Sequence, residues 1–271
     1  MDLKQLLGSK LTKKELRHLR TSYDVIGSIA IIEIPKELKK KEKIIGNAIL
    51  QLRKEVKTVC KKAGIHKGKY RTQKLTVIAG EKTKEATYRE NGCVMKLNVE
   101  KVYFSPRLAT ERRRIAEQVK GGESVLVMFS GVAPYPLVIA RMAKPKEIFG
   151  IELNPVAHKY ALENVALNKI KNITLIKGDV RKVRLNKKFD RVVMPLPKGG
   201  EDFLDVALKY AKKKGIVHFY DFLHETEFDL AQKKVMEACS KAKRKCKILK
   251  FTKCGQYGPG IFRVCVDFEA F

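Results

Sequence analysis

The 271-residue sequence predicts an α/β fold with a Rossmann-like, mostly parallel sheet, preceded by a small α+β domain. Three observations predict it. Beyond about residue 105, short apolar strand-like runs alternate with helical segments. Residues 23–104 contain strands and a helix without that alternation, and a hydrophobic share of 44% suffices for buried cores. We expect a basic segment at residues 1–20, the small domain at 21–100 and the α/β domain at 101–271.

The small domain begins with a predicted strand pair at residues 23–35, which turns at a Gly-Ser dipeptide and stops at a proline. Apolar residues at helical spacing over 38–59 predict the helix that follows, and Gly64 stands where a C-terminal cap is expected. Residues 74–80 and 93–104 are predicted to be strands joined by a charged turn. These elements make a small α+β unit.

The larger domain is predicted from repeated strand–helix units. The helix expected at 155–169 has Asn154 as its N-cap and a proline at its first position, and a helix at 105–120 is expected to be capped by Ser105. Such repeats favour a mostly parallel sheet covered on both faces. The predicted strands are 125–129, 148–151, 173–176, 191–194 and 215–219.

The charge balance indicates a polyanionic partner. Lys and Arg number 58 against 29 Asp and Glu, which gives a formal net charge of +29. So large an excess repels itself in a folded chain and is relieved when phosphates displace counterions, so nucleic acid is the first candidate. The alternative is a lysine-rich surface that serves solubility and ion pairs.

Composition also limits location and metal content. No apolar run approaches the roughly 18 residues of a membrane span, and the first 20 residues lack the apolar core of a signal peptide, so we expect a cytoplasmic protein. The six cysteines include no C-x-x-C pair. We therefore expect reduced thiols and no metal site.

A cofactor site is predicted at the carboxyl ends of the strands, where ligands bind in such sheets. The first strand ends in a small-residue turn containing Gly131, and the second ends at Glu152, 21 residues later. At that distance an acid can hold a ribose hydroxyl pair, while the glycine lets the backbone approach the ligand. Asp179 follows the third strand, where an adenine amine could be recognised.

The turn favours S-adenosylmethionine over a dinucleotide. A pyrophosphate normally needs the G-x-G-x-x-G pattern, whereas here Gly131 is followed by Ala133, Pro134 and Pro136. S-adenosylmethionine has no phosphates, so a methyltransferase is favoured over a dehydrogenase. Alternatively, Glu152 could serve only as a favourable negative charge at the helix N-terminus near Asn154. That interpretation does not explain Asp179.

Seven dissimilar stretches occur in one order along the chain: VYFSPRLATER (102–112), MFSGVAPYP (128–136), IELNP (151–155), GDVR (178–181), RVVMPLPK (191–198), IVHFYDF (216–222) and YGPGIFRVCVDF (257–268). With these stretches the sequence, from about residue 21 to 271, resembles the archaeal tRNA guanosine-37 N1-methyltransferases. The resemblance implies a class I methyltransferase fold with an N-terminal RNA-recognition domain, S-adenosylmethionine as methyl donor, and the purine at position 37 of the tRNA anticodon loop as target.

The resemblance also implies roles for single residues. Glu111, in LATER, matches a catalytic position, and a carboxylate there could remove the guanine N1 proton as N1 attacks the methyl group. Arg71, in GKYRT, matches a second, where a guanidinium could brace a phosphate or the developing charge. Besides Gly131, the cofactor contacts implied are Tyr103, Phe129, Glu152, Leu153, Asp179, Val180, Pro195 and Leu196.

From the residues alone, both catalytic candidates have plainer interpretations. Glu111 is followed by three arginines, a pattern more typical of a solvated ion pair. Arg71 shares a basic loop with His66, Lys67 and Lys69, where it would be one more phosphate contact.

The sequence departs from the family pattern in three places. Val127 stands where most members carry an acid. The family's separate domain for the tRNA body is missing before residue 21, which predicts a weaker grip on the tRNA elbow. Pro195-Leu196-Pro197 replaces Asn-Leu-Pro, so the loop has no side-chain amide for the base. Pro195 resembles the archaeal branch that also methylates 4-demethylwyosine, and both substrate ranges stay open.

Three other functions were weighed against a monomeric tRNA methyltransferase. A related family uses the same fold to transfer the aminocarboxypropyl group of the cofactor, and the pose of the cofactor decides between the two. A non-catalytic RNA-binding protein would keep the basic surface, although Glu111, Glu152 and Asp179 argue against it. A dehydrogenase is disfavoured for want of glycines.

Overall fold

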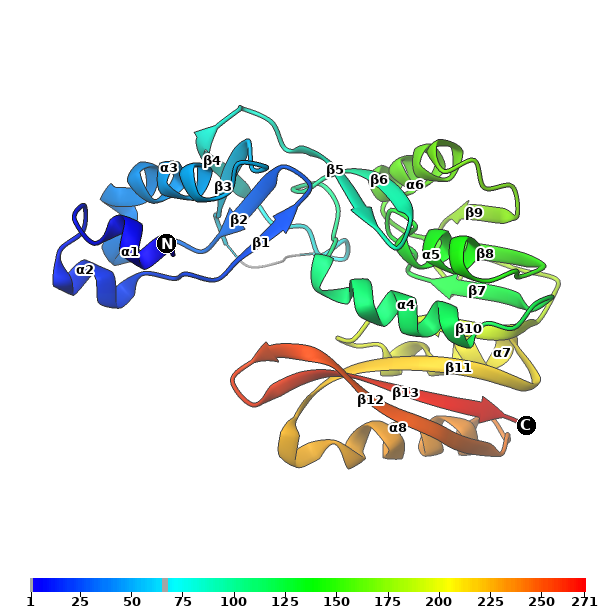
Figure 1. The fold of residues 1–271 in the computed structure, drawn as a ribbon. Coiled ribbons are helices and arrows are strands. Elements are labelled where there is room, and N and C mark those ends of the chain that lie inside the picture. Colours follow the sequence, from blue (N-terminus) through cyan, green and yellow to red (C-terminus); the bar gives the residue numbers. More distant parts are fainter. Residues whose placement is uncertain (1, 65–67) are drawn as a thin grey trace. The chain divides into compact units, whose positions relative to one another are not determined.

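The computed structural model describes residues 2–64 and 68–271, and the chain forms two compact units (Figure 1). The N-terminal unit is Met1–Glu90 with Val94–Pro106, and the C-terminal unit is Asn91–Cys93 with Arg107–Phe271. Each is described by itself. His66 and Lys67 of the basic loop lie outside the described residues.

The N-terminal unit is built around a four-stranded sheet in the order β1-β2-β3-β4. The predicted hairpin is confirmed as β1 (Tyr23–Ile26) and β2 (Ile29–Ile32). β3 (Thr58–Lys62) runs parallel to β2, and β4 (Leu75–Gly80) is antiparallel to β3. The 3-10 helix η1 (Lys36–Lys41) leads into α3 (Glu42–Leu52), which packs on this sheet.

Two short helices precede this sheet and share its core. α1 (Leu3–Leu7) and α2 (Lys13–His18) each begin with a capping box, in which an N-cap side chain and the residue three positions later bond to each other's backbone. Leu3, Leu7 and Leu11 are buried with the apolar face of α3. The two capping boxes, Asp2…Gln5 and Thr12…Glu15, are the local signals that start helices in this basic segment.

Two predictions in the N-terminal unit are wrong. The helix expected over 38–59 ends at Leu52, and Gly64 caps no helix, because residues 58–62 form β3 between two other strands. Backbone pairing on both sides of β3 outweighs the helical spacing of its apolar residues. The expected charged turn contains β5 (Glu85–Glu90), which pairs with β6 (Cys93–Asn98), so the strand expected over 93–104 ends early.

The C-terminal unit holds a seven-stranded sheet in the order β12-β13-β11-β10-β7-β8-β9. The strands from β11 to β9 are parallel neighbours, whereas β13 is antiparallel to β11 and β12. The chain order reverses between β7 and β10, which marks the crevice where ligands bind in such sheets. The strands are β7 (Ser124–Met128), β8 (Glu147–Glu152), β9 (Ile173–Lys177), β10 (Phe189–Met194), β11 (Ala211–His224), β12 (Cys246–Gly258) and β13 (Ile261–Ala270).

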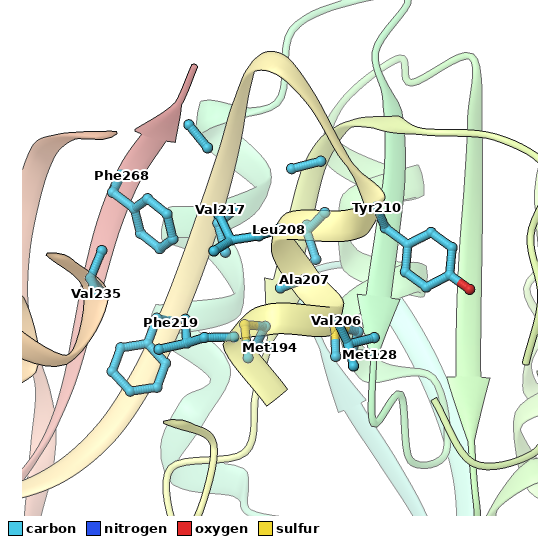
Figure 2. Close-up of a cluster of buried hydrophobic side chains, with 14 of the residues drawn as sticks. Met128, Met194, Val206, Ala207, Leu208, Tyr210, Val217, Phe219, Val235 and Phe268 are labelled. Atoms are coloured by element: carbon cyan, nitrogen blue, oxygen red, sulfur yellow. The ribbon is translucent and has the colours of Figure 1, made fainter. Parts of the chain in front are cut away.

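Helices cover this sheet on both faces, as predicted. Alternate residues such as Met194 of β10 and Phe219 of β11 point into a core with α7 (Leu204–Tyr210) and α8 (Asp229–Lys241) (Figure 2). Residues of the opposite parity, such as Tyr220, face α4 (Ala109–Gln118) and α5 (Pro134–Met142). The remaining α-helix of this unit is α6 (Pro155–Leu167).

The helix ends differ in how well the sequence predicted them. Asn154 caps α6 through its side chain, with a proline at the first position, as expected. Ser105 does not cap α4: the 3-10 helix η2 (Pro106–Leu108) comes first, and Leu108 at the cap position makes no side-chain bond. Within residues 2–64 and 68–271, no helix has both the length and the apolar character needed to cross a membrane. None of the six cysteines forms a disulfide bond.

Candidate active site

The turn after β7 is unusually tight for its residue types. Phe129, Gly131 and Ala133 all adopt left-handed backbone angles, with φ of 55°, 57° and 69°. Only the glycine adopts such angles without a steric cost, so the turn stores strain where the chain order reverses. The turn is held by hydrogen bonds from Ser130 N to Ile151 O and from Ala133 N to Ser130 O, both 2.9 Å.

Glu152, at the tip of β8, joins this turn to the next loop. Its Oε2 accepts a hydrogen bond from Gly131 N at 2.7 Å, and its Oε1 accepts one from Asn154 N at 2.7 Å. Burial raises the pKa of the Glu152 carboxyl, and these backbone donors oppose that rise. Carboxylate oxygens have further lone pairs, so Glu152 can accept ligand hydroxyls while it holds the turn.

An aromatic contact that the sequence did not predict lies beside this edge. The rings of Phe129 and Phe203 meet edge to face at 5.0 Å, and the Arg181 guanidinium lies 4.1 Å from the centre of the Phe203 ring. Asp179 accepts a hydrogen bond from Arg181 N at 2.9 Å, so its loop is closed locally. Val180 is buried in the core, while Leu153 is half-buried at the tip of β8.

The loop after β10 is compact. Leu196 N donates to Met194 O at 2.7 Å, which closes a turn of three residues around Pro195. Proline suits its centre because its φ is fixed and its missing N–H is not needed. The loop then folds back on Gly200, where a β-carbon would lie 2.2 Å from the Leu196 carbonyl oxygen.

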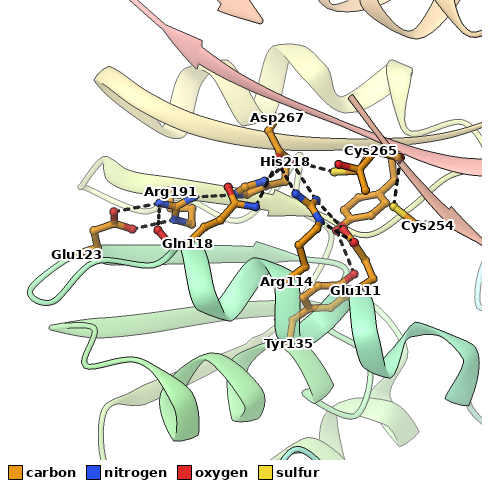
Figure 3. Close-up of polar contacts among 12 residues, drawn as sticks. Glu111, Arg114, Gln118, Glu123, Tyr135, Arg191, His218, Cys254, Cys265 and Asp267 are labelled. Carbon is orange, nitrogen blue, oxygen red and sulfur yellow. Dashed lines mark hydrogen bonds and ion pairs between the residues drawn. The ribbon is translucent and has the colours of Figure 1, made fainter. Parts of the chain in front are cut away.

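Glu111, on α4, is 4% exposed and takes part in a buried ion pair. Arg114 donates from Nε to Oε2 at 2.7 Å and from Nη2 to Oε1 at 2.8 Å. The Tyr220 hydroxyl donates to Oε1 at 2.5 Å and itself accepts from Tyr135, in the first turn of α5, at 3.1 Å (Figure 3). The solvated ion pair considered for Glu111 is therefore wrong: the pair is buried.

The network continues across the sheet from Arg114 to Asp267 of β13 (Figure 3). Asp267 Oδ1 lies 2.6 Å from His218 Nδ1, and Arg191 Nη1 lies 2.8 Å from His218 Nε2. Because a guanidinium only donates, Nε2 accepts and Nδ1 carries the proton, so His218 is neutral. Burial lowers the pKa of His218, in agreement with the neutral ring.

Among the described residues, His218, Cys265 and Asp267 bring possible metal ligands within 4.8 Å of one another. Both ring nitrogens of His218 are already hydrogen-bonded, and Arg114 and Arg191 place two positive charges beside the group. This surrounding disfavours a cation, and the group is better described as a hydrogen-bonded ion-pair cluster.

The structure divides the predicted site residues between the two units. Arg71, with φ of 51°, and the exposed Tyr103 belong to the N-terminal unit. In the C-terminal unit, Gly131 and Glu152 are in direct contact. The remaining candidates there follow the carboxyl ends of neighbouring strands: Phe129 after β7, Leu153 after β8, Asp179 and Val180 after β9, Pro195 and Leu196 after β10.

Comparison with known proteins identifies the family. A model described as the TRM5/TYW2 methyltransferase domain matches residues 86–249, more than half of the chain. The chain belongs to the TRM5/TYW2 methyltransferase family. A TYW2 N-terminal domain model matches residues 3–83. The family resemblance predicted from the sequence is thereby confirmed.

Curated members of the TRM5/TYW2 family resemble the chain over most of its length. A Pyrococcus abyssi tRNA (guanine(37)-N(1))-methyltransferase Trm5b is 42% identical over 93% of this chain and 76% of the relative. A Nanoarchaeum equitans tRNA (guanine(37)-N(1))/4-demethylwyosine(37)-methyltransferase Taw22 is 36% identical over 91% and 98%. A Methanocaldococcus jannaschii tRNA(Phe) (4-demethylwyosine(37)-C(7)) aminocarboxypropyltransferase is 31% identical over 90% and 96%.

Solved structures of TRM5/TYW2 members have the same fold. Wild-type Trm5b from Pyrococcus abyssi superposes with a TM-score of 0.89 at 41% identity, covering 96% of this chain and 78% of that one. A complex of aTrm5 with tRNALeu gives 0.88 at 32%, covering 99% and 78%. P. horikoshii TYW2 in complex with MeSAdo gives 0.83 at 25%, covering 99% and 98%. The predicted class I methyltransferase fold with a separate N-terminal domain is confirmed.

Proposed function

We propose that this protein is an S-adenosylmethionine-dependent tRNA methyltransferase that acts on the purine at position 37, with guanosine N1 as the first substrate. The observation that carries the proposal is the contact between Glu152 and the Gly131 backbone at the crevice where the strand order reverses. It belongs to a chain whose relative at 42% identity is named for guanine-37 N1 methylation. The net charge of +29 suits an RNA substrate.

The C-terminal unit supplies the proposed cofactor site. Glu152 accepts the ribose hydroxyls, while Gly131 lets the backbone approach and Asp179 receives the adenine amine. Phe129, Leu153, Val180, Pro195 and Leu196, which follow the carboxyl ends of neighbouring strands, supply further contacts. When bound, the cofactor supplies an electrophilic methyl group on its sulfonium.

The base is handled by Glu111, Arg71 and the loop at Pro195. Glu111 is the general base for the N1 proton: among the described residues its Oε2 receives a hydrogen bond from Arg114 alone, which leaves a lone pair for the base. Arg71 steadies a phosphate or the developing charge. The target has to leave the anticodon stack, because N1 of a stacked base is hard to reach. The N-terminal unit recognises RNA, and the enzyme acts as a monomer.

A second candidate substrate, 4-demethylwyosine, is favoured by the loop around Pro195. This loop can present backbone carbonyls and a wall, but no side-chain amide, to the base. Its closed turn leaves room in place of the amide. The relative named for both guanine-37 and 4-demethylwyosine methylation is matched over 98% of its length.

The proposed function is tested with two tRNAs, one carrying guanosine and one carrying 4-demethylwyosine at position 37. We expect cofactor labelled on its methyl carbon to label both guanosine N1 and the tricyclic base. Nucleoside mass spectrometry identifies the labelled base. Pro195→Asn is expected to keep the first activity and lower the second about tenfold or more, because the amide fills the space of the third ring.

Two outcomes contradict this scheme. Label on guanosine alone in both proteins removes the second substrate. Transfer of label only from cofactor labelled in its amino-acid chain identifies aminocarboxypropyl transfer, the activity named for the Methanocaldococcus jannaschii relative matched over 96% of its length.

A further inference from the structure

Arg114 bridges two buried carboxylates. It holds Glu111 at two points, Nε to Oε2 at 2.7 Å and Nη2 to Oε1 at 2.8 Å, and donates from Nη1 to Asp267 Oδ2 at 2.5 Å. The two side-chain partners are only 3% and 1% exposed. A planar guanidinium shared in this way fixes both the position and the plane of each carboxylate.

Asp267 is itself held from the side away from Glu111. It accepts hydrogen bonds from His218 Nδ1 at 2.6 Å, from Gln118 Nε2 at 3.2 Å and from the Cys265 thiol at 3.2 Å. His218 is locked in turn by Arg191, which pairs with Glu123. The His218 and Arg114 contacts hold the pKa of Asp267 far below its usual range, so Asp267 stays charged and Arg114 stays in place.

The groups that face Glu111 come from four elements. Arg114 lies on α4, Tyr135 on α5, Tyr220 on β11, and Asp267 and Cys265 on β13. Arg114 is the cation that bonds the carboxylate directly, whereas the two phenols and the thiol are neutral, because burial raises the pKa of each.

We propose that Arg114, anchored by Asp267 and His218, is a positioning residue that fixes the place and plane of the Glu111 carboxylate for proton removal. The inference rests on the proposed role of Glu111 as general base. It assigns the buried cluster behind Glu111 to the reaction and not to stability alone.

The test compares variants by kcat and KM for methyl transfer to guanosine-37 tRNA. Arg114→Met is expected to lower kcat about tenfold or more while KM for tRNA stays within about twofold, because the carboxylate loses the fork that fixes its plane. Arg114→Lys restores the charge without the two-point fork, so kcat should stay low.

Arg113→Met is the matched control. Arg113 precedes Arg114 on the same helix, pairs with Glu117 and has a side chain that is 60% exposed. The Arg113→Met substitution removes the same positive charge from the protein without removing a contact to Glu111. We expect its kcat to stay at the wild-type value.

The outcomes separate this inference from the proposed function. Glu111→Gln is expected to lower turnover about 100-fold while cofactor affinity, measured by calorimetry, is unchanged. If Glu111→Gln is inactive and folded Arg114→Met keeps the wild-type kcat, the positioning role is wrong and the base assignment survives. If Glu111→Gln retains full turnover, the base assignment itself fails. If Arg114→Met does not fold, an Arg114→Lys variant with the wild-type kcat overturns the inference.

Discussion

At the scale of single residues, Glu152 connects two backbone segments at the proposed cofactor site. Its carboxylate accepts backbone N–H groups from Gly131 and from Asn154, so it ties the strained turn after β7 to the start of α6. The charge near Asn154 that was considered as an alternative is therefore present. The proposed ribose contact would use the remaining lone pairs of the same carboxylate.

We expect Glu152→Ala to weaken S-adenosylmethionine binding about tenfold or more, because it removes the ribose acceptor and releases Gly131. Wild-type affinity should also fall on acidification. Burial raises the pKa of this carboxyl above 4.5, so the ionised acceptor is lost as pH falls through that raised value. Isothermal titration calorimetry measures the cofactor affinity of the variant at neutral pH and that of the wild type as pH is lowered.

Glu147→Gln is the control. Glu147 is the first residue of β8, at the end opposite to Glu152, and pairs with Lys187. Equal losses for Glu147→Gln and Glu152→Ala would show that the strand and not the acceptor is responsible.

At the scale of elements, the loop between β10 and α7 depends on the glycine that closes it. A β-carbon at Gly200 would lie 2.2 Å from the Leu196 carbonyl and 3.2 Å from the Tyr220 carbonyl, both backbone atoms that cannot move independently. The proline turn at the start of the loop and the glycine at its end therefore define one shape. This shape carries two of the proposed cofactor contacts.

Gly200→Ala should displace this loop and lower kcat about tenfold or more, since small misplacements near a reacting group are costly. Gly258→Ala is the matched control, because a β-carbon there meets nothing within 4 Å. Steady-state methyl transfer and thermal melting measured on both variants test the expectation. An unchanged kcat in folded Gly200→Ala would show that the loop shape does not limit the reaction.

Local sequence signals predicted the parallel strands well and the paired strands of the N-terminal unit less well. The runs at 125–129 and 191–194 are β-branched and continuous, as buried parallel strands require. The helical spacing of Val56 and Val59 extends the predicted helix into the start of β3, although strand partners on both sides decide the conformation there. The charged strand at 85–90 gave no apolar signal at all.

The candidate site was predictable only where its contacts follow chain order. Gly131 and Glu152 could be paired because their spacing is fixed by one strand–helix–strand unit. Arg114 and Asp267 are 153 residues apart, and Tyr220 and Glu111 are 109 apart. No local pattern encodes such pairs, so the buried surroundings of Glu111 were missed, as was the Phe203 contact with Phe129.

At the scale of the whole molecule, charge dominates. A net charge of +29 destabilises the folded chain through self-repulsion. Bound anions relieve this repulsion. The buried cluster contributes little to this excess, because Arg114 and Arg191 are paired with Glu111, Asp267 and Glu123. The uncompensated charge therefore belongs to the solvent-facing lysines and arginines.

The affinity for tRNA should consequently fall steeply with salt. With about six or more phosphate contacts, we expect a loss of about a thousandfold between roughly 50 and 200 mM monovalent salt. Fluorescence anisotropy with labelled tRNA measures the slope. Cofactor affinity over the same range is the control, since the cofactor has no phosphates, and a flat tRNA dependence would contradict the charge argument.

The place of Asp267 has a consequence for biosynthesis. It lies on β13, which inserts antiparallel between β11 and β12 after the rest of the sheet has been synthesised. The contact of Asp267 with Arg114 spans 153 residues, and contacts so distant along the chain form slowly compared with neighbouring strand–helix units. A nascent chain could therefore fold β7 to β10 and the turn at Gly131 while Arg114 still lacks its anchor. Catalytic competence should then appear only when the last strand is in place, later than the ability to bind the cofactor.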